Sequence, residues 1–154
     1  EHLLQAIASS QRGLKFSGLM FIDLDNFKPV NDIYGHKTGD SLLVEVAHRL
    51  LSAVRQADTV ARFGGDEFIV LLRDIDTEIE RSKLHIQHIA AKIANELARP
   101  FPLSEHNMHQ CACSIGLVLF QGDNNCDELL RQADTAMYQA KRLGRNQPCW
   151  FSDK

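Results

Sequence analysis

The chain has 154 residues, the length of one compact domain, and its composition excludes several classes of protein. With 44% apolar and 24% charged residues, it is neither a disordered tail nor a collagen-like fibre. The 17 basic and 20 acidic residues give a net charge of −3, which argues against a nucleic-acid partner and a polybasic membrane anchor. No apolar run approaches the roughly 18–20 residues that span a bilayer.

The first residue and the cysteine content favour a piece of a cytoplasmic protein. The chain starts at Glu1 rather than at methionine, so we expect a single domain over residues 1–154, excised from a longer multidomain protein. Four cysteines are few enough to suit a reducing cytosol. We therefore expect a cytoplasmic domain, and the sequence leaves open whether the longer protein is attached to a membrane.

Hydrophobic spacing in the first half of the chain predicts helices around a buried strand. In order, the pattern predicts a helix remnant over 1–9, a strand over 17–24, a short helix near Pro29 and an amphipathic helix over 38–57. Two short strands follow, over 59–63 and 68–72. Gly64-Gly65-Asp66-Glu67 joins them, which predicts a hairpin because glycine readily adopts positive φ.

The second half of the chain continues the mixed pattern. A long amphipathic helix is predicted over 77–98, and two strand-like stretches flank a polar tip at 104–107, the second running to Phe120. A helix over 126–143 and a strand over 149–151 close the chain. The order βααββαβ, with additions, predicts an α+β domain with an antiparallel central sheet and helices packed on one face.

Acidic residues gather at the end of the first predicted strand and at the hairpin. Asp23 and Asp25 are two residues apart, so both point to one side of the strand. Asp66 and Glu67 lie at the tip of a hairpin that can sit beside it. Carboxylates that converge from two strands repel one another unless a divalent cation joins them, and hard oxygen ligands suit Mg²⁺. The site then indicates phosphoryl or nucleotidyl transfer; the alternative is a solvated strand end.

The residues after the first strand suit a purine nucleotide. The ammonium group of Lys28 can hold phosphates near the acidic residues. Asp40 can accept hydrogen bonds from guanine N1–H and N2–H₂, donors that adenine lacks, and the amide of Asn31 can pair with the same base. The alternative for Asp40 is an acidic residue near a helix start, which the macrodipole favours.

Three motifs resemble those of a known family. Residues 62–68, with the sequence RFGGDEF, resemble the signature of the GGDEF family, the diguanylate cyclases. Residues 23–40 follow the pattern D-x-D-x-F-K-x-x-N-D-x-x-G-H-x-x-G-D, which is similar to the family's nucleotide-binding stretch. Residues 136–146 resemble its closing helix. The likeness covers almost the whole chain in the right order, but the family's opening D-x-L-T-x-L-x-N-R turn is missing.

The resemblance implies a fold like that of the adenylyl cyclases and the polymerase palm, with helices packed around the sheet. It implies an enzyme that condenses two GTP into cyclic di-GMP and releases two pyrophosphates, with Mg²⁺, or alternatively Mn²⁺, as cofactor. The implied metal ligands are the carboxylates of Asp23 and Asp66 and the backbone carbonyl of Leu24. Asp66 or Glu67 is the implied base, and the sequence does not separate the two.

The same resemblance assigns the residues that bind substrate. Lys28 is implied to stabilise charge on the transferring phosphate, and Lys141 and Arg145 to hold the triphosphate. Asn31 and Asp40 are implied to bind the guanine base. For His36 the sequence leaves two roles open, a substrate ligand or a structural polar contact.

Symmetry and a further motif predict partners and regulation. One GTP per domain cannot close a symmetric ring, so the active species should be a two-fold homodimer, with an N-terminal sensory module in the longer protein. Arg55 and Asp58 form R-x-x-D at the family's spacing for a site where cyclic di-GMP inhibits; the alternative is a surface ion pair worth roughly 0.2–0.5 kcal/mol. A second candidate function is a GTP-binding regulatory module without turnover that controls an adjacent phosphodiesterase domain.

Overall fold

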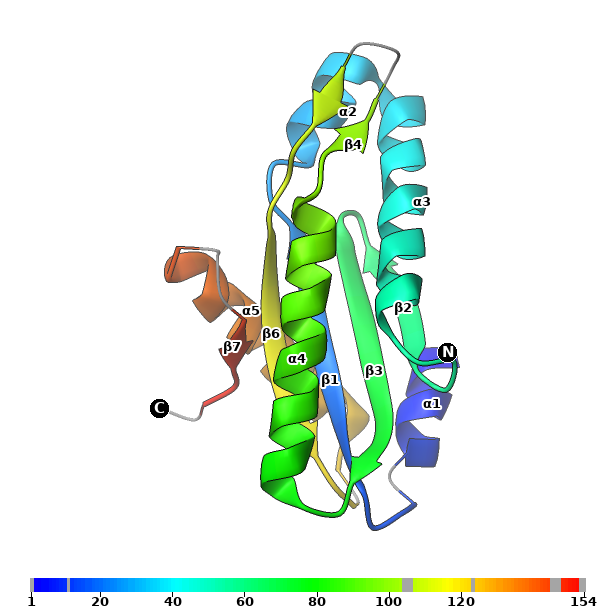
Figure 1. Cartoon of the computed structure of the whole chain (residues 1–154), viewed down its shortest axis with the longest axis vertical. Coiled ribbons are helices and arrows are strands. Elements are labelled where there is room, and N and C mark those ends of the chain that lie inside the picture. The colour runs from blue at the N-terminus through cyan, green and yellow to red at the C-terminus, as the bar shows by residue number, and fades with distance from the viewer. Residues whose placement is uncertain (1, 11, 104–106, 123, 145–147, 153–154) are drawn as a thin grey trace.

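The computed structural model describes residues 2–10, 12–103, 107–122, 124–144 and 148–152 (Figure 1). The elements in these ranges are α1 His2–Ser10, β1 Phe16–Leu24, α2 Lys28–Tyr34, α3 His36–Ala53, β2 Thr59–Gly64, β3 Glu67–Asp76, α4 Ile79–Ala98, β4 Phe101–Pro102, β5 Met108–His109, β6 Cys113–Phe120, α5 Cys126–Arg142 and β7 Cys149–Trp150. The run from β1 to β6 confirms the predicted order βααββαβ, with the small β4–β5 pair as an addition. None of the helices in these ranges is long and apolar enough to cross a membrane.

Two element boundaries differ clearly from those predicted. The helix α3 ends at Ala53, before the predicted end at 57, because the backbone N–H of Arg55 donates to the Asp58 carboxylate at 2.8 Å and the chain turns out of the helix. The strand β3 extends to Asp76 rather than to residue 72. It is longer because it pairs with β1 as far as Phe16.

Five strands form the central sheet, in the order β2-β3-β1-β6-β7. The central strand β1 pairs antiparallel with β3 and β6, whereas β7 pairs parallel with β6 at the edge. Asp23, near the end of β1, lies opposite Glu67 of β3 and Ser114 of β6. The carboxyl end of β1 therefore meets the β2–β3 turn.

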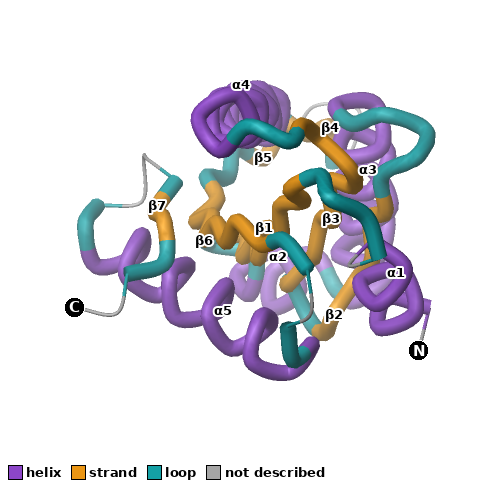
Figure 2. The backbone as a smooth tube through the Cα atoms, turned by 90° about the horizontal axis from the view of Figure 1, so that it is seen from below, coloured by secondary structure: helices purple, strands orange, loops and turns teal. Residues whose placement is uncertain are grey.

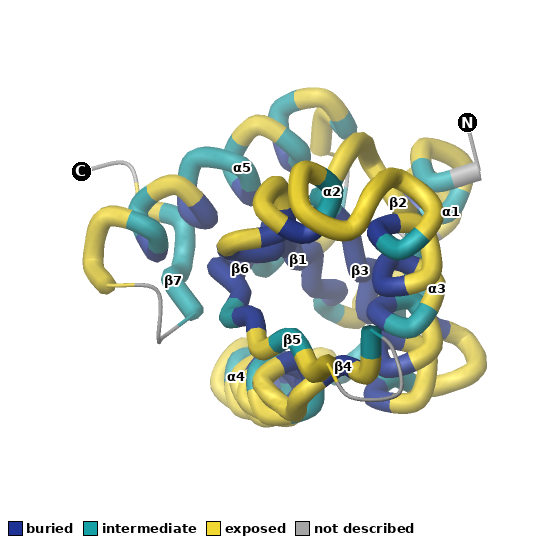
Figure 3. The backbone as a smooth tube through the Cα atoms, turned by 90° about the horizontal axis from the view of Figure 1, so that it is seen from above, coloured by how far each residue is buried: buried dark blue, intermediate teal, exposed yellow. Residues whose placement is uncertain are grey.

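Helices cover both faces of the sheet, whereas the element order alone predicts them on one face (Figure 2). Alternate residues of β1 explain the difference. Met20 and Ile22 belong to the core that includes α3 and α4, while Leu19 and Phe21 belong to the core that includes α1 and α5. Side chains alternate across a strand, so a continuous apolar run requires cover on both sides. Figure 3 shows these buried strands enclosed by helices whose outer sides are exposed.

A glycine in β6 lets α5 approach the sheet closely. A Cβ atom on Gly116 would lie 2.2 Å from the carbonyl oxygen of Ala133 and 2.3 Å from the backbone nitrogen of Met137. Only glycine fits such an approach of two backbones. This close packing holds α5 against the sheet, so that Lys141, one turn after Met137, reaches the acidic end of β1.

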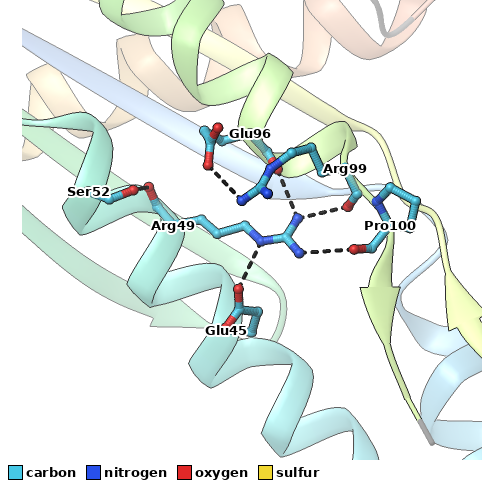
Figure 4. Close-up of polar contacts among 6 residues, drawn as sticks. All are labelled: Glu45, Arg49, Ser52, Glu96, Arg99 and Pro100. Carbon is cyan, nitrogen blue, oxygen red and sulfur yellow. Dashed lines mark hydrogen bonds and ion pairs between the residues drawn. The ribbon is translucent and has the colours of Figure 1, made fainter. Parts of the chain in front are cut away.

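A buried arginine joins α3 to the end of α4 (Figure 4). Arg49 donates to the backbone carbonyls of Glu96 at 2.8 Å, Arg99 at 2.7 Å and Pro100 at 3.0 Å. Its Nε donates to Glu45 at 3.0 Å, and its guanidinium lies 3.6 Å from the centre of the Phe101 ring. The last carbonyls of a helix have no partner inside it, so the Arg49 clasp, meaning Arg49 with these three carbonyls, caps α4.

Candidate functional site

Backbone pairing brings the two predicted metal-binding carboxylates to one place. Asp23 is buried near the end of β1, opposite Glu67. The backbone N–H of Leu24 donates to the carbonyl oxygen of Asp66 at 3.1 Å, which holds the β2–β3 turn against β1. We call Asp23, Asp66 and Glu67 the acidic cluster. The predicted convergence of carboxylates from two strands is thus present in the structure.

The acidic cluster has the electrostatics of crowded carboxylates. Burial and the negative charge of Asp23 raise the pKa of Asp66 above its ordinary value of 3.8. Burial, Asp23 and Asp134 of α5 likewise raise the pKa of Glu67 above 4.5. Desolvation and like charges both favour the protonated carboxyl. A cation placed among these groups would relieve this cost.

Lys141 supplies a positive charge from the closing helix. Its ammonium group forms an ion pair with Oδ2 of Asp23, and the two side chains are 29% and 8% exposed. Burial acts to lower the pKa of Lys141, but the hydrogen bond and charge of Asp23, with the charges of Asp25 and Asp66, raise it overall. Lys141 therefore stays charged at neutral pH.

Asp25 lies on the β6 side of the same strand end. It is buried, and the hydroxyl of Ser114 donates to its two oxygens at 3.5 and 3.4 Å. Its backbone N–H donates to the carbonyl of Ala112 at 2.8 Å. Asp25 thus contributes negative charge toward Lys141 while it is tied to β6.

The donor set of the acidic cluster fits a hard divalent cation. Oδ1 of Asp23 is buried and has no hydrogen-bond partner among the described residues, so it is an acceptor that lacks a donor. The described residues contain no group of three or more His, Cys, Asp or Glu placed to hold one ion. Magnesium commonly uses one or two carboxylates and completes its shell with water and substrate phosphates. Two carboxylates therefore suffice for this type of site.

The residues predicted to meet the nucleotide surround the loop that follows β1. Lys28 begins α2 and is exposed, and His36 begins α3 and is exposed. Oδ1 of Asn31 is buried without a partner in the described chain, and a Cβ atom on Gly39 would lie 1.8 Å from it. Glycine at position 39 thus makes room for the Asn31 amide between α2 and α3.

Asp40 lies on α3, one residue beyond that glycine. It is exposed and lines a groove of about 360 Å³ between α3 and β2, together with Val44, Arg62 and Phe68. The guanidinium of Arg62 donates to the carbonyl of Gly65 at 3.0 Å, which ties the groove to the β2–β3 turn. A flat apolar ring with polar edges suits such a groove. Arg145, predicted to bind the triphosphate, lies outside the described residues.

The R-x-x-D pair lies at the opposite end of β2 from the acidic cluster. The Asp58 side chain is 0% exposed and forms an ion pair with Arg55 at 2.9 Å. Its oxygens also accept from the backbone N–H groups of Arg55 at 2.8 Å and Arg73 at 3.1 Å. Arg55 is 41% exposed. Asp58 therefore shapes the loop after α3, and Arg55 is the member of the pair that faces solvent.

Sequence reasoning missed two contributors to the site. Asp134 raises the pKa of Glu67, and Ser114 contacts Asp25. A usable signal existed for Asp134, because it precedes Lys141 by seven residues and so lies on the same face of α5. Ser114 carried no local signal, since its position opposite Asp23 follows only from strand pairing.

Comparison with known proteins now identifies the chain. The family described as diguanylate cyclase, GGDEF domain, matches residues 1–147. The chain belongs to this family. It is 41% identical over 152 residues to the bifunctional diguanylate cyclase/cyclic di-GMP phosphodiesterase MucR of Pseudomonas aeruginosa. The matched region covers 98% of this GGDEF chain but 21% of MucR. The GGDEF domain thus spans about a fifth of that relative.

Solved structures of GGDEF proteins share the fold. An EAL/GGDEF domain protein from M. capsulatus is 42% identical, with a TM-score of 0.83 and coverage of 97% of this chain and 94% of that chain. The GGDEF domain of DgcB from Caulobacter crescentus, in complex with c-di-GMP, is 26% identical, with a TM-score of 0.82 and coverage of 97% and 85%. The resemblance predicted from the motifs is confirmed, and so is the α+β fold.

Proposed function

We propose that this GGDEF domain is an active diguanylate cyclase that condenses two GTP into cyclic di-GMP. The observation that supports this most is the acidic cluster at the end of β1, where Asp23, with a buried oxygen that has no partner in the described part of the chain, lies beside Asp66. In each half-reaction the 3′-oxygen of one GTP attacks the α-phosphorus of the other. The bond to pyrophosphate breaks, so two pyrophosphates leave for each cyclic di-GMP.

The metal would be Mg²⁺ or Mn²⁺, held by the carboxylates of Asp23 and Asp66 and the carbonyl of Leu24. Bound there, the ion supplies charge stabilisation on the phosphates and lowers the pKa of a coordinated hydroxyl. Oδ1 of Asp23, which has no partner among the described residues, and the pKa of Asp66, raised by burial and by the charge of Asp23, support this assignment, because both indicate negative charge that Lys141 compensates only in part.

A carboxylate of the acidic cluster would accept the proton of the 3′-hydroxyl. Asp66 and Glu67 both have a raised pKa, which makes each a better base than an exposed carboxylate. Asp66 would lose basicity on binding metal, whereas Glu67 keeps it, and both remain candidates. The exposed ammonium of Lys28 is free to reach the transferring phosphate, and Lys141, with Arg145, would hold the triphosphate.

Guanine recognition would use the region between α2, α3 and β2. Oδ1 of Asn31, which has no partner among the residues that the structure describes, can accept from a base N–H. The exposed Asp40 can accept from N1–H and N2–H₂ of guanine. The exposed His36 begins α3 and would either bind the substrate or make a structural polar contact.

Two such domains must face each other, because each holds one GTP and the product is a two-fold ring. A homodimer is therefore the proposed active species, assembled by a sensory module in the longer protein. Cyclic di-GMP would also inhibit through Arg55, whose exposed guanidinium suits a guanine edge or a phosphate. Asp58, fully buried, would hold Arg55 in place rather than bind the base through its own oxygens.

The second candidate is a GTP-binding module without turnover that controls a phosphodiesterase domain. The name of MucR supports only the second half of this candidate, a phosphodiesterase in the same longer protein, because that name also includes cyclase activity. The two functions separate in one experiment, in which the domain is fused to a dimeric coiled coil and incubated with GTP and Mg²⁺. Mass spectrometry should find cyclic di-GMP; intact GTP that is nevertheless bound would establish the regulatory module instead.

A further inference from the structure

Lys141 lies where a cation is needed by the acidic cluster. Its ammonium pairs with Asp23, and its charge also interacts with Asp25 and Asp66. The side chain comes from α5, which Gly116 allows to sit directly against the sheet. A positive charge of the chain itself therefore already neutralises part of the proposed metal site.

The two oxygens of Asp23 have different surroundings. Oδ2 pairs with Lys141, while Oδ1 is buried and has no partner among the described residues. A divalent ion that binds Asp23 comes within a few ångströms of the ammonium, and like charges at that distance repel strongly away from bulk water. The ion and Lys141 thus compete for the same carboxylate.

We infer that Lys141 exchanges partners, pairing with Asp23 in the free domain and with the triphosphate when nucleotide and metal arrive together. The inference rests on the proposed function. The metal alone then binds weakly, because it must displace or oppose the ammonium. Nucleotide removes this competition by offering Lys141 a new anion, so that metal and nucleotide load as a pair.

The side chain of Lys141 is suited to this exchange. Lysine carries a compact charge on a flexible four-carbon stem, so it can move without losing a fixed set of hydrogen bonds. At 29% exposure it also has a path to solvent, where the triphosphate would lie.

Binding of Mn²⁺ alone tests the inference without any turnover. The concentration of free Mn²⁺ is measured by electron paramagnetic resonance during titration of the wild-type domain and of Lys141→Gln, with no nucleotide present, which gives the dissociation constant of each. Since removing a like charge a few ångströms from the ion relieves repulsion of at least about 1 kcal/mol, we expect Lys141→Gln to bind Mn²⁺ about tenfold more tightly. Arg142→Gln is the matched control, because it removes the same charge from the next residue, which is exposed and lines a different groove. It should change the affinity less than about twofold.

The outcomes separate this inference from the proposed function. Equal or weaker Mn²⁺ binding by Lys141→Gln overturns the exchange of partners, and Lys141→Met, which also removes the charge, repeats the test if the glutamine variant does not fold. Asp23→Asn should abolish Mn²⁺ binding in both the wild-type and Lys141→Gln backgrounds. If Asp23→Asn leaves Mn²⁺ binding unchanged, the metal site itself is wrong, and the inference falls with it.

Discussion

Arg49 and Lys141 are both cations set into the interior of the domain, and their surroundings differ. Arg49 is 6% exposed, and its guanidinium donates to three carbonyls and to Glu45 while it packs on Phe101. Lys141 makes one ion pair to a carboxylate whose other oxygen has no partner among the described residues. Around Arg49, donors and acceptors are matched. Around Lys141, one acceptor, Oδ1 of Asp23, has no donor among the described residues.

This difference distinguishes a contact that holds the fold from one that prepares a site. Buried polar groups are nearly always paired, so an unpaired carboxylate oxygen marks a place where an external group is expected. The Arg49 clasp needs no such group. Substitutions in the acidic cluster should therefore change chemistry with little loss of stability, and substitutions in the clasp should do the reverse.

The largest effect should come from Asp66→Asn. Removing a carboxylate that holds the metal should lower the turnover of a forced dimer at least about a thousandfold, equivalent to about 4 kcal/mol. The thermal midpoint should not fall, because Asp66 lies in a turn and is only half-buried. Asp74→Asn is the control, since it removes a carboxylate at an exposed position where asparagine tolerates the positive φ of 48°. Comparable product from Asp66→Asn and Asp74→Asn would show that the acidic cluster is not the reaction site.

Arg49→Met should give the largest loss of stability. The change removes the side-chain donors from the Arg99 and Pro100 carbonyls, just after α4, and one of two donors from the Glu96 carbonyl, which should lower the free energy of unfolding by about 3 kcal/mol. For a domain of this size the thermal midpoint then falls by about 6–12 °C. Arg99→Met is the matched control, because its side chain is 60% exposed and forms an ion pair with Glu96 at the surface. That pair should contribute less than about 1 kcal/mol. An equal loss in both variants would mean that the clasp does not cap α4.

Asp40→Ala should change selectivity rather than the maximal rate. If Asp40 accepts from guanine N1–H and N2–H₂, its removal should reduce the preference for GTP over ATP by about 1–3 kcal/mol. Competition binding with both nucleotides measures the ratio. Glu80→Ala, at an exposed position in the first turn of α4 and outside the nucleotide-binding stretch, serves as the control. An unchanged ratio in Asp40→Ala would assign Asp40 to the helix start alone.

The smallest effect should be a pH dependence of stability that originates in the acidic cluster. The pKa values of Asp66 and Glu67 are raised above 3.8 and 4.5, so the folded state binds more protons than the unfolded state between these values and the raised ones. Stability contributed by these groups is then greatest at low pH and declines as pH rises through that interval. Denaturant unfolding at several pH values should show this decline, and Asp66→Asn should flatten it. A decline of the same slope in that variant would place its origin elsewhere.

Local patterns predicted much of the fold and the core of the site. Asp23 adjoins the apolar run of β1, and Asp66 and Glu67 adjoin the glycines of the hairpin, so the single pairing of β1 with β3 was enough to bring these acidic residues together. The clasp was not predictable, because Arg49 reads as a solvent-facing charge on α3 until the end of α4 is placed against it. Burial of Asp58 likewise depends on Arg73, fifteen residues away on β3. These features require tertiary contacts that spacing along the chain does not encode.

The most direct test compares how ligand stabilises variants of the two regions. Thermal unfolding is followed with and without Mn²⁺ plus a non-hydrolysable GTP analogue at about one hundred times the dissociation constant measured for wild type. A ligand that binds only the folded domain should add about 2.7 kcal/mol. We predict the same gain for wild type and Arg49→Met, although the latter starts from lower stability, and little gain for Asp23→Asn. Full stabilisation of Asp23→Asn, or its loss in Arg49→Met, would contradict the division between a contact that holds the fold and an acidic cluster that binds the metal.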